Sequence, residues 1–396
     1  MRIALLIPGR FHGFDLGRAL LAEGHEVGIF TNYPGWAVAR FGFPSDRVTS
    51  FALHGAAERV AMRATRHRPS AYPQSTMLPL FGKWAARAVR RQPWDVVHAW
   101  SGAALELLRE PLRPPVLLMR GSSHIVVQDR LLAEESDRTR MVLERPSDWM
   151  VRRELDEYAL ADRVLVLSSF AAATFVASGV PESRVSVVPL GVDVEAFRAP
   201  AAALAARRER IKSGRPLKVL YVGALSYRKG LFDLERVIDT LAGEPFEFVL
   251  AGPAAAEASS AIARLHTKAT ILGKRPQHDL PAVYAAADVF VFPTIEDGFA
   301  MVLTQAKASG LPIVTTPNSA GPDLVHEGRD GWIVPIRRPD AIVDRLRWCD
   351  ANRAALADVA DDVAARYRPQ DWRDVAPAFV RACEDMRDEM TEHTRG

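Results

Sequence analysis

At 396 residues the chain is too long for one hydrophobic core of ordinary size, and its length predicts two domains. Its composition, with 48% hydrophobic and 25% charged residues and a net charge of +3, is that of a globular protein and excludes fibrous and low-complexity classes. Cys349 and Cys383 are the only cysteines, so we expect neither a disulfide framework nor a cysteine-based metal site, which fits a reducing compartment.

The first half of the chain alternates strand and helix patterns. MRIALLIPGR opens with a short apolar run stopped by Pro-Gly, which predicts a first strand over Ile3–Ile7 and not a signal peptide. Further strands are predicted at Glu26–Phe30, Val96–Ala99, Val116–Met119, Val164–Leu167 and Val185–Val188, and helices at Leu16–Glu23, Trp149–Ala161 and Phe170–Ser178. This alternation predicts a parallel sheet with helices on both faces. No run of about 18 apolar residues occurs, so we expect no spanning helix and a cytoplasmic protein.

The first predicted turn contains glycines but lacks a dinucleotide-binding fingerprint. Gly9, Gly13 and Gly17 do not form Gly-x-Gly-x-x-Gly, which argues against a nicotinamide-dependent enzyme. Because loops at the carboxyl ends of parallel strands commonly hold ligands, His12 and Gly13 are candidates for contact with an acceptor substrate or a diphosphate. A loop histidine without a special role is the alternative.

A local excess of basic residues lies between Glu58 and Arg91. This segment contains one acidic residue, Glu58, and eight basic residues, namely Arg59, Arg63, Arg66, Arg68, Lys83, Arg87, Arg90 and Arg91. Such a segment suits peripheral contact with an anionic membrane, on its inner face, or a phosphate-bearing acceptor. A solvated basic face is the simpler alternative. We expect no nucleic acid partner, because no recognised nucleic-acid-binding module accompanies the bases.

The second half of the chain repeats the design of the first. A polar, Ala- and Arg-rich segment over residues 198–215 predicts a linker. Strands are then predicted at Lys218–Val222, Phe246–Ala251, Thr270–Leu272, Val289–Pro293, Ile313–Thr316 and Trp332–Val334, and helices at Leu231–Ala242, Leu280–Ala287 and Phe299–Ser309. The predicted fold class is α/β, with two tandem doubly wound Rossmann-like domains and a ligand cleft between the carboxyl ends of their strands.

The loop after the strand Lys218–Val222 carries two adjacent cations. A turn glycine such as Gly223 allows close approach of the backbone to a ligand. Arg228 and Lys229 stand at the start of the next helix, where cations oppose the helix dipole. We therefore interpret both as contacts for a phosphate-bearing leaving group. Two exposed basic residues without a ligand are the alternative.

The stretch from Val289 to Thr316 predicts a buried strand, an acidic turn, a helix and a second buried strand. We expect Asp297, Gly298 and Phe299 to open the helix, so that its first N–H groups suit an anion while Asp297 caps the helix or binds a ligand hydroxyl. Gln305 lies a little over two turns further on, with an amide that can donate and accept hydrogen bonds. An ordinary helix cap with an exposed Gln305 is the alternative.

These motifs resemble those of the retaining, nucleotide-sugar-dependent glycosyltransferases of family 4, whose hallmark is a Glu-Gly-Phe-Gly turn with a second Glu eight positions after the first. Asp297 stands where the first Glu is usual, Ala300 where the second Gly is usual and Gln305 where the second Glu is usual. In the loop VGALSYRKG, Lys229 matches the family and Ala224 replaces its usual Arg, a charge that Arg228 can supply. The segments ADRVLVLSSF, SVVPLGVDVEAF and VLAGP extend the resemblance over nearly the whole chain.

The resemblance implies the GT-B fold. It divides the chain into an acceptor-side domain over 1–197, a linker over 198–215, a nucleotide-sugar-binding domain over 216–367 and a C-terminal helix over 368–396 that returns to the first domain. A plain terminal amphipathic helix is the alternative for this last segment.

The resemblance also implies roles for individual residues. The catalytic candidates are His124, Lys229, Arg228 and Asp297. His124 follows the strand Val116–Met119, where its ring could contact a sugar hydroxyl or stabilise positive charge at the reacting carbon. Arg120 is a further acceptor-side candidate. The donor-binding candidates are Gly223, Arg228, Lys229, Gly273, Arg275, Asp297, Gly298, Phe299, Ala300 and Gln305. Neither a cofactor nor a metal is expected, since no carboxylate cluster is placed to hold one.

The implied activity is transfer of a sugar, with retention of anomeric configuration, from a nucleotide-diphosphate sugar to a glycan, lipid-linked or small-molecule acceptor. Ala224, Asp297 and Gln305 depart together from the family pattern, so a non-catalytic protein that binds nucleotide sugars is an alternative. A sugar-nucleotide epimerase of the same fold is another.

Overall fold

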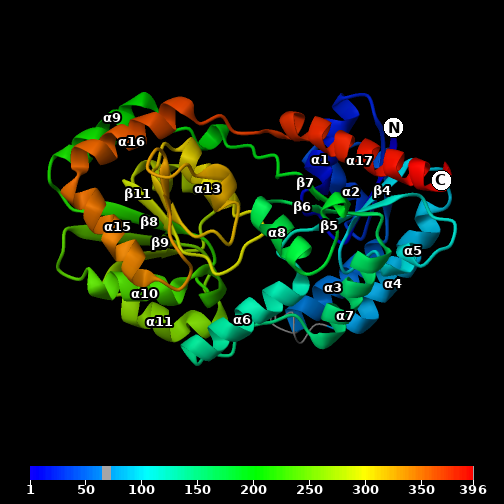
Figure 1. Ribbon diagram of the computed structural model, residues 1–396, viewed down its shortest axis with the longest axis horizontal. Coiled ribbons are helices and arrows are strands. Elements are labelled where there is room, and N and C mark those ends of the chain that lie inside the picture. The colour runs from blue at the N-terminus through cyan, green and yellow to red at the C-terminus, as the bar shows by residue number, and fades with distance from the viewer. Residues whose placement is uncertain (65–72, 396) are drawn as a thin grey trace.

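The computed structural model describes residues 1–64 and 73–395, and it contains two wholly parallel sheets that lie side by side (Figure 1). The first sheet has the order β3-β2-β1-β4-β5-β6-β7, with β1 (Arg2–Ile7), β2 (Glu26–Thr31), β3 (Val48–Ser50), β4 (Val96–Trp100), β5 (Val116–Arg120), β6 (Arg163–Val166) and β7 (Val185–Val187). The second has the order β10-β9-β8-β11-β12-β13, with β8 (Leu217–Val222), β9 (Phe246–Ala251), β10 (Ala269–Gly273), β11 (Val289–Phe292), β12 (Ile313–Thr315) and β13 (Gly331–Ile333).

This topology confirms the predicted pair of doubly wound sheets. The predicted strands are all present with small shifts at their ends, because runs of β-branched and aromatic residues buried on both faces mark central parallel strands. Every residue of β11 is buried, for example. The sequence reasoning missed β3, which has three residues at the sheet edge and no fully buried side chain.

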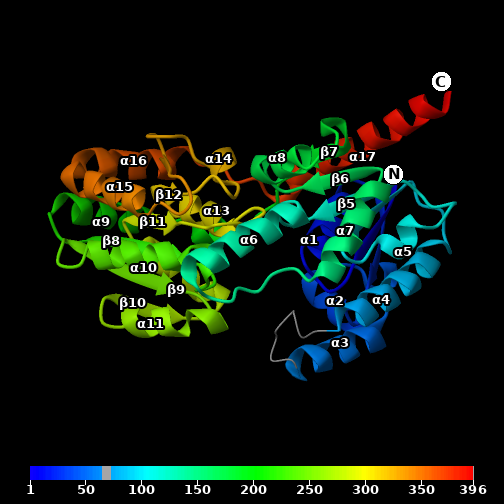
Figure 2. The same cartoon turned by 60° about the horizontal axis from the view of Figure 1, so that its bottom comes forward.

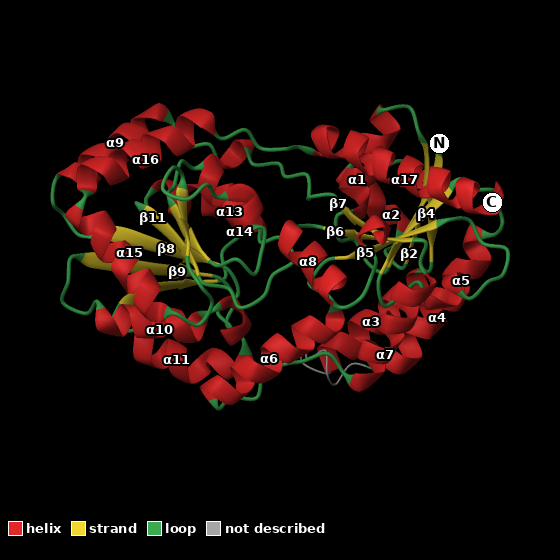
Figure 3. Cartoon of the chain, in the orientation of Figure 1, coloured by secondary structure: helices red, strands yellow, loops and turns green. Residues whose placement is uncertain are grey.

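Helices cover both faces of each sheet (Figure 3). Those of the first half are α1 (Gly13–Ala22), α2 (Gly35–Val38), α3 (Ala52–Ala64), α4 (Gln74–Val89), α5 (Leu105–Leu108), α6 (Ile125–Thr139), α7 (Asp148–Leu160) and α8 (Ser169–Ala177). Those of the second half are α9 (Ala201–Lys212), α10 (Leu231–Thr240), α11 (Ser259–Leu265), α12 (Leu280–Ala285), α13 (Met301–Ala308), α14 (Gly321–Leu324), α15 (Pro339–Ala351), α16 (Arg353–Arg366) and α17 (Trp372–Arg395).

The segment predicted as a linker, 198–215, is largely helix α9, which packs against α16 in the second half of the molecule. Arg207 anchors it: its fully buried guanidinium donates to five backbone carbonyls, those of Tyr284, Ala285, Ala287, Ser309 and Gly310, at 2.7–3.3 Å. The linker prediction was therefore wrong for these residues. The polar composition of this segment suggested a linker between domains. The guanidinium of Arg207 is instead buried against the carboxyl ends of two helices, whose carbonyl groups accept its hydrogen bonds.

The chain passes between the two sheets twice, and the two passages touch. The first lies between β7 and α9 and the second between α16 and α17, and the N–H of Val192 donates to the carbonyl of Gln370 at 2.9 Å between them. After the second passage α17 lies on α1 of the first half (Figure 1). The ring of Phe379 in α17 also contacts the ring of His98 in β4.

Helix α6 provides a further contact between the halves and lies between them in two views (Figures 1 and 2). Near its C-terminal end Arg138 pairs with Asp233 of α10 at 2.7 Å, and the buried carboxylate of Glu135 accepts from Arg337 at 3.0 Å. The cleft between the sheets is thus bridged by ionic contacts at one side.

Of the basic segment, Arg66 and Arg68 lie outside the described residues, whereas its other bases are exposed on α3, on α4 and just after α4. In the described part of the chain no helix combines the length and the apolar content needed to cross a bilayer.

Candidate active site

The acidic turn after β11 is organised by Asp297. One oxygen of its carboxylate accepts the backbone N–H groups of Phe299 at 3.1 Å and Ala300 at 2.8 Å. Helix α13 begins at Met301, two residues later than predicted, and Ala300 precedes it with a left-handed backbone, φ 63°. The expectation that Gly298 and Phe299 open the helix was therefore wrong, because the Asp297 side chain folds the residues into a turn first. Asp297 acts as the cap of this turn.

Lys229 reaches the other carboxylate oxygen of Asp297. Its Nζ lies 2.6 Å from Oδ2 and 3.0 Å from the carbonyl oxygen of Glu296. The glycine that follows, Gly230, has φ 81°, and a Cβ there would lie 1.9 Å from the carbonyl oxygen of Pro293. Only glycine permits this close approach of the two loops, and it brings Lys229 to the turn after β11.

Arg228 bridges the two halves of the molecule. Its guanidinium lies 2.6 Å from Glu296 Oε2 and donates to Ser122 Oγ at 2.9 Å. Arg228 and Lys229 thus converge on one turn, as the sequence predicted, and both remain partly exposed. Two cations beside a turn of backbone amides can neutralise the charge of a departing diphosphate.

Glu296 is a residue that the sequence reasoning missed. Its side chain is fully buried, and one oxygen accepts from Ser122 Oγ at 2.9 Å and from the N–H and Oγ of Ser123 at 2.9 and 2.8 Å. Gln128 donates to the other oxygen at 3.3 Å. The sequence motif drew attention to Asp297, the residue after Glu296. No local pattern at Glu296 reveals its partners in the loop after β5 and in α6, which lie more than 160 residues away in the sequence. Glu296 closes the cleft by joining the turn after β11 to the loop after β5.

The electrostatics of this cluster favour charged side chains. Burial alone would raise the pKa of Asp297 and of Glu296, but the adjacent Lys229 and Arg228 outweigh it and hold both carboxyl pKa values below their ordinary range. Burial lowers the pKa of Lys229, and the charge of Asp297 opposes that change. A diphosphate that approaches Lys229 must therefore compete with an ionised Asp297.

The first-half candidates at the end of β5 contact side chains of their own half. Arg120 pairs with Glu154 at 2.7 Å and donates to Gln128 Oε1 at 2.7 Å. The ring of His124 packs between Tyr158 and Phe175, with centroids 5.0 and 4.9 Å away, and burial lowers its pKa to about 4, so the ring is neutral at pH 7. Its Nδ1 is buried without a hydrogen-bond partner among the described residues. The predicted catalytic role of His124 stays a prediction.

The glycine turn after β1 also packs within the first half. His12 stacks on Trp372 of α17, with ring centroids 6.0 Å apart. Gly13 opens α1, and a Cβ at this position would lie 1.7 Å from Ile7 Cδ1, so its glycine is explained by packing on β1. The acceptor-side roles of His12 and Gly13 stay predictions.

The remaining donor-side candidates surround the same end of the second sheet. Gly223 ends β8, Gly273 ends β10 with φ 65°, and Arg275 is exposed beyond it. Gly298 lies against the carbonyl oxygen of Gly121 across the cleft. Gln305 was expected to be either a ligand contact or exposed; it is buried, and its Oε1 accepts from Tyr284 Oη at 3.0 Å. In the described part of the chain no group of three acidic, His or Cys side chains is placed to hold a metal ion.

Comparison with known proteins decides the family. The model described as Glycosyltransferase Family 4 matches residues 11–196, and the one described as Glycosyl transferases group 1 matches residues 216–352. The protein belongs to glycosyltransferase family 4.

Curated relatives of this family 4 protein are similar over part of their length. A D-inositol 3-phosphate glycosyltransferase of Corynebacterium urealyticum is 30% identical over 251 residues, which cover 58% of each chain. A GDP-mannose-dependent alpha-(1-6)-phosphatidylinositol monomannoside mannosyltransferase of Mycobacterium tuberculosis is 26% identical over 328 residues, 78% of this chain and 82% of that one. The chain spans about half the length of several relatives, such as 47% of a putative colanic acid biosynthesis glycosyltransferase of Salmonella typhimurium.

Solved structures extend the likeness of the fold to the whole chain. Sucrose-phosphate synthase of Thermosynechococcus elongatus superimposes with a TM-score of 0.71 at 18% identity, covering 98% of this chain and 100% of that one. HepE of Anabaena, in complex with UDP and glucose, superimposes with a TM-score of 0.64 at 16% identity, over 97% and 99%. These matches confirm the GT-B fold expected for a family 4 glycosyltransferase.

Proposed function

We propose that the protein transfers a sugar from a nucleotide-diphosphate sugar to a hydroxyl-bearing acceptor with retention of anomeric configuration. The observation that carries this proposal is the meeting of Lys229 and Arg228 at the Asp297–Ala300 turn, at the carboxyl ends of β8 and β11. Ligands of open parallel sheets bind at this edge, where strand order reverses, and β8 and β11 are the strands on either side of such a reversal. Family membership supports the same reaction.

The chemistry we propose is stabilisation of the leaving group. As the bond from the anomeric carbon to the diphosphate oxygen breaks, negative charge grows on the diphosphate, and Lys229 and Arg228 neutralise it. Asp297 then exchanges its contact with Lys229 for one with a sugar hydroxyl. Glu296, which holds the two halves together, excludes water from the reacting carbon in the closed state.

The acceptor class we propose is a sugar, glycan or lipid-linked polyol that enters between the loops of the first half. Relatives named for inositol phosphate and phosphatidylinositol mannoside acceptors support this class. For lipid-linked acceptors we propose peripheral contact with an anionic membrane through the basic segment Arg59–Arg91. On α3 the side chains of Leu53 and Val60 are 82% and 66% exposed beside Arg59 and Arg63, so apolar and cationic groups share one surface.

Flotation with phosphatidylglycerol vesicles tests the membrane contact. Binding at low salt that weakens as salt rises, and that Arg59→Glu with Arg63→Glu abolishes, is the expected result. The absence of binding at low salt removes this part of the proposal without touching the transfer reaction.

A second candidate is a protein of the same fold that binds nucleotide sugars without turnover. Gln305 stands where the family usually has a Glu. Its side chain is buried and accepts a hydrogen bond from Tyr284, and this contact favours a structural role for the residue. A thermal-shift screen against nucleoside diphosphates and their sugar conjugates, followed by addition of an acceptor, separates the two candidates. Under both candidates the ligand should raise the melting temperature, because a ligand bound only by the folded state stabilises it. Only the enzyme then releases the nucleoside diphosphate when an acceptor is added, with a product whose anomeric configuration NMR can assign.

A further inference from the structure

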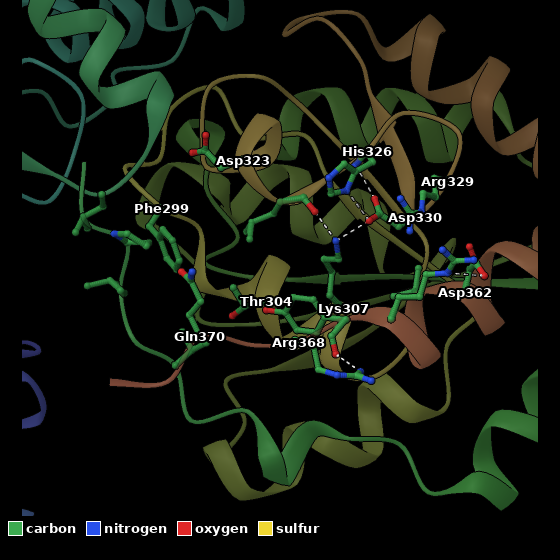
Figure 4. Close-up of a pocket in the computed structure, with 18 of the residues that line it drawn as sticks. Phe299, Thr304, Lys307, Asp323, His326, Arg329, Asp330, Asp362, Arg368 and Gln370 are labelled. Atoms are coloured by element: carbon green, nitrogen blue, oxygen red, sulfur yellow. Dashed lines mark hydrogen bonds and ion pairs between the residues drawn. The ribbon is translucent and has the colours of Figure 1, made fainter. Parts of the chain in front are cut away.

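A cavity lies at the end of the cleft where the chain passes between the two halves. Its volume is about 550 Å³, and both halves line it, with Leu167 and Leu190 from the first half and Phe299 and Lys307 from the second. Figure 4 shows this cavity with Phe299 and Lys307 at its wall. Such a volume is that of a site for a small organic molecule.

Helix α13 separates this cavity from the candidate active site. Thr304 and Lys307 line the cavity, whereas Gln305 points to Tyr284 on another side of the helix. Lys229 and Asp297 are not among the lining residues. The cavity is therefore distinct from the donor side of the turn, although Phe299 of that turn forms part of its wall.

The acidic groups of the cavity wall already have partners. Asp330 accepts from Lys307 at 2.7 Å and lies 3.0 Å from His326 Nδ1, and Asp362 accepts from Arg366 at 3.2 Å. Asp323 accepts the N–H of Ser169 across the cleft at 2.9 Å. None of these carboxylates is left to repel an anion strongly.

Two guanidinium groups of the wall lack an acidic partner. The side chain of Arg329 makes no hydrogen bond or ion pair within the described part of the chain, and that of Arg368 donates only to the carbonyls of Ala365 and Tyr367. Figure 4 labels both at the cavity, with Arg329 beside His326. Guanidinium groups of this kind bind phosphate, sulfonate or carboxylate groups.

The passages between the halves supply apolar side chains to the same cavity. Leu190 and Val192 line it from the first passage, Val187 from the end of β7 just before it, and Tyr367 and Gln370 from the second passage. The two passages are joined there by the Val192–Gln370 hydrogen bond. A molecule bound here contacts both passages, and its binding favours the arrangement of the halves in which these residues form one wall.

We propose that this hinge cavity binds an amphipathic organic anion, whose apolar body lies against the passage residues and whose acidic group pairs with one of the two guanidinium groups, that of Arg329 or that of Arg368. Its occupancy shifts the equilibrium between the open and closed arrangements of the two halves. The site goes beyond the transfer reaction and needs no nucleotide sugar.

The probe for this proposal is 1-anilinonaphthalene-8-sulfonate, which joins an aromatic body to one sulfonate and fluoresces in an apolar site. We expect saturable binding of one equivalent to the full chain, weakened at least tenfold in Arg329→Ala with Arg368→Ala. The matched control removes two exposed arginines far from the cavity, Arg152→Ala with Arg381→Ala, and should keep the affinity of the wild type.

A second variant and a second readout complete the test. Val187→Trp adds bulk from a half-exposed wall position and should also abolish binding, and the dye should slow hydrogen exchange at 187–192 and 367–370. Equal affinity in the cavity variants and the control would overturn the proposal. So would competitive displacement of the dye by a nucleoside diphosphate, because the dye would then occupy the donor side.

Discussion

The two walls of the cleft use their polar side chains in opposite ways. On the second-half wall Lys229, Arg228 and Asp297 meet at one turn within hydrogen-bond distance. On the first-half wall Arg120 pairs with Glu154 and the ring of His124 packs between aromatic side chains. The polar side chains of the second-half wall thus contact one another across two loops, whereas those of the first-half wall contact residues of their own half. Glu296 is one of the residues that connect the walls, together with Arg228, and variants can separate the contributions of the walls.

The largest expected effect is on the connection itself. Glu296→Ala removes a buried carboxylate that has partners on both walls and leaves Arg228 and the Ser122–Ser123 loop unpaired. Leaving buried hydrogen-bond donors without an acceptor costs about 1–3 kcal/mol each, and donors of both Ser122 and Ser123 lose their acceptor here, whereas Arg228 is 35% exposed and regains water. We expect a loss of this size in the free energy of unfolding or of domain closure, measured by denaturant titration and small-angle scattering. Glu247→Ala, at an exposed strand position, is the control; an equal loss in both variants would show that Glu296 does not join the walls.

The first-half wall should be sensitive to pH through Glu157. Its buried carboxylate accepts the N–H groups of Gly102, Ala104 and Leu105 in the loop after β4, and burial raises its pKa to about 7. When folding raises the pKa of a carboxyl group, the protonated group stabilises the native state. This contribution is complete below the pKa of the group in the unfolded chain, and it is lost as pH rises through the pKa in the folded protein, about 7 here. We expect this group to remove about 3 kcal/mol between pH 4.5 and pH 8.

Denaturant titrations of Glu157→Gln across this range measure that contribution. The variant should show a flatter dependence of stability on pH than the wild type. Identical pH profiles would mean that the loop after β4 does not depend on the ionisation of Glu157.

On the second-half wall Gln305 can be tested for contact with the donor. If the amide of Gln305 binds the ribose of the donor, Gln305→Ala should raise the KM for the donor by about tenfold, the effect of losing one hydrogen bond to a polar ligand. It should lower kcat less than this. Tyr284→Phe removes the hydrogen bond between the two side chains and a longer one, of 3.5 Å, from Tyr284 Oη to the carbonyl of Val302. A KM that rises equally in both variants would instead assign Gln305 a packing role.

The smallest expected effect is a gain in stability at the turn. Ala300 has φ 63°, a conformation that strains any residue with a Cβ by about 1–2 kcal/mol. Ala300→Gly should therefore raise the free energy of unfolding by up to about 1 kcal/mol after the entropy cost of glycine. Ala355→Gly, at an exposed position of α16, should lower it by a similar amount; a loss of stability in both variants would contradict the strain.

Sequence reasoning predicted the parts of this protein whose information is local. Twelve strands and the doubly wound topology follow from apolar runs, and two short motifs drew attention to Lys229 and Asp297, which the structure brings into contact. It could not find Glu296, because the residues that bind its carboxylate come from a loop in the other half of the chain. It misjudged 198–215, because the five carbonyls that accept from Arg207 converge only after α12 and α13 are packed.

The first-half wall shows the same limit. A histidine after a strand that faces a cleft suggested contact with substrate, but the direction of the His124 ring depends on Tyr158 and Phe175, which belong to α7 and α8. Positions at a strand end are predictable from pattern, whereas the direction of a side chain there depends on which helices pack beside it.

The central claim is that Lys229 stabilises the departing diphosphate, and the kinetics of Lys229→Ala test it most directly. Transfer should be followed with saturating acceptor, beside Lys268→Ala, which removes an exposed lysine that pairs with Asp239 on the protein surface. We predict that kcat/KM for the donor falls about a hundred- to a thousandfold in Lys229→Ala, the effect of removing one group that stabilises developing negative charge, and is unchanged in Lys268→Ala. A kcat/KM in Lys229→Ala equal to that of the wild type would contradict the account.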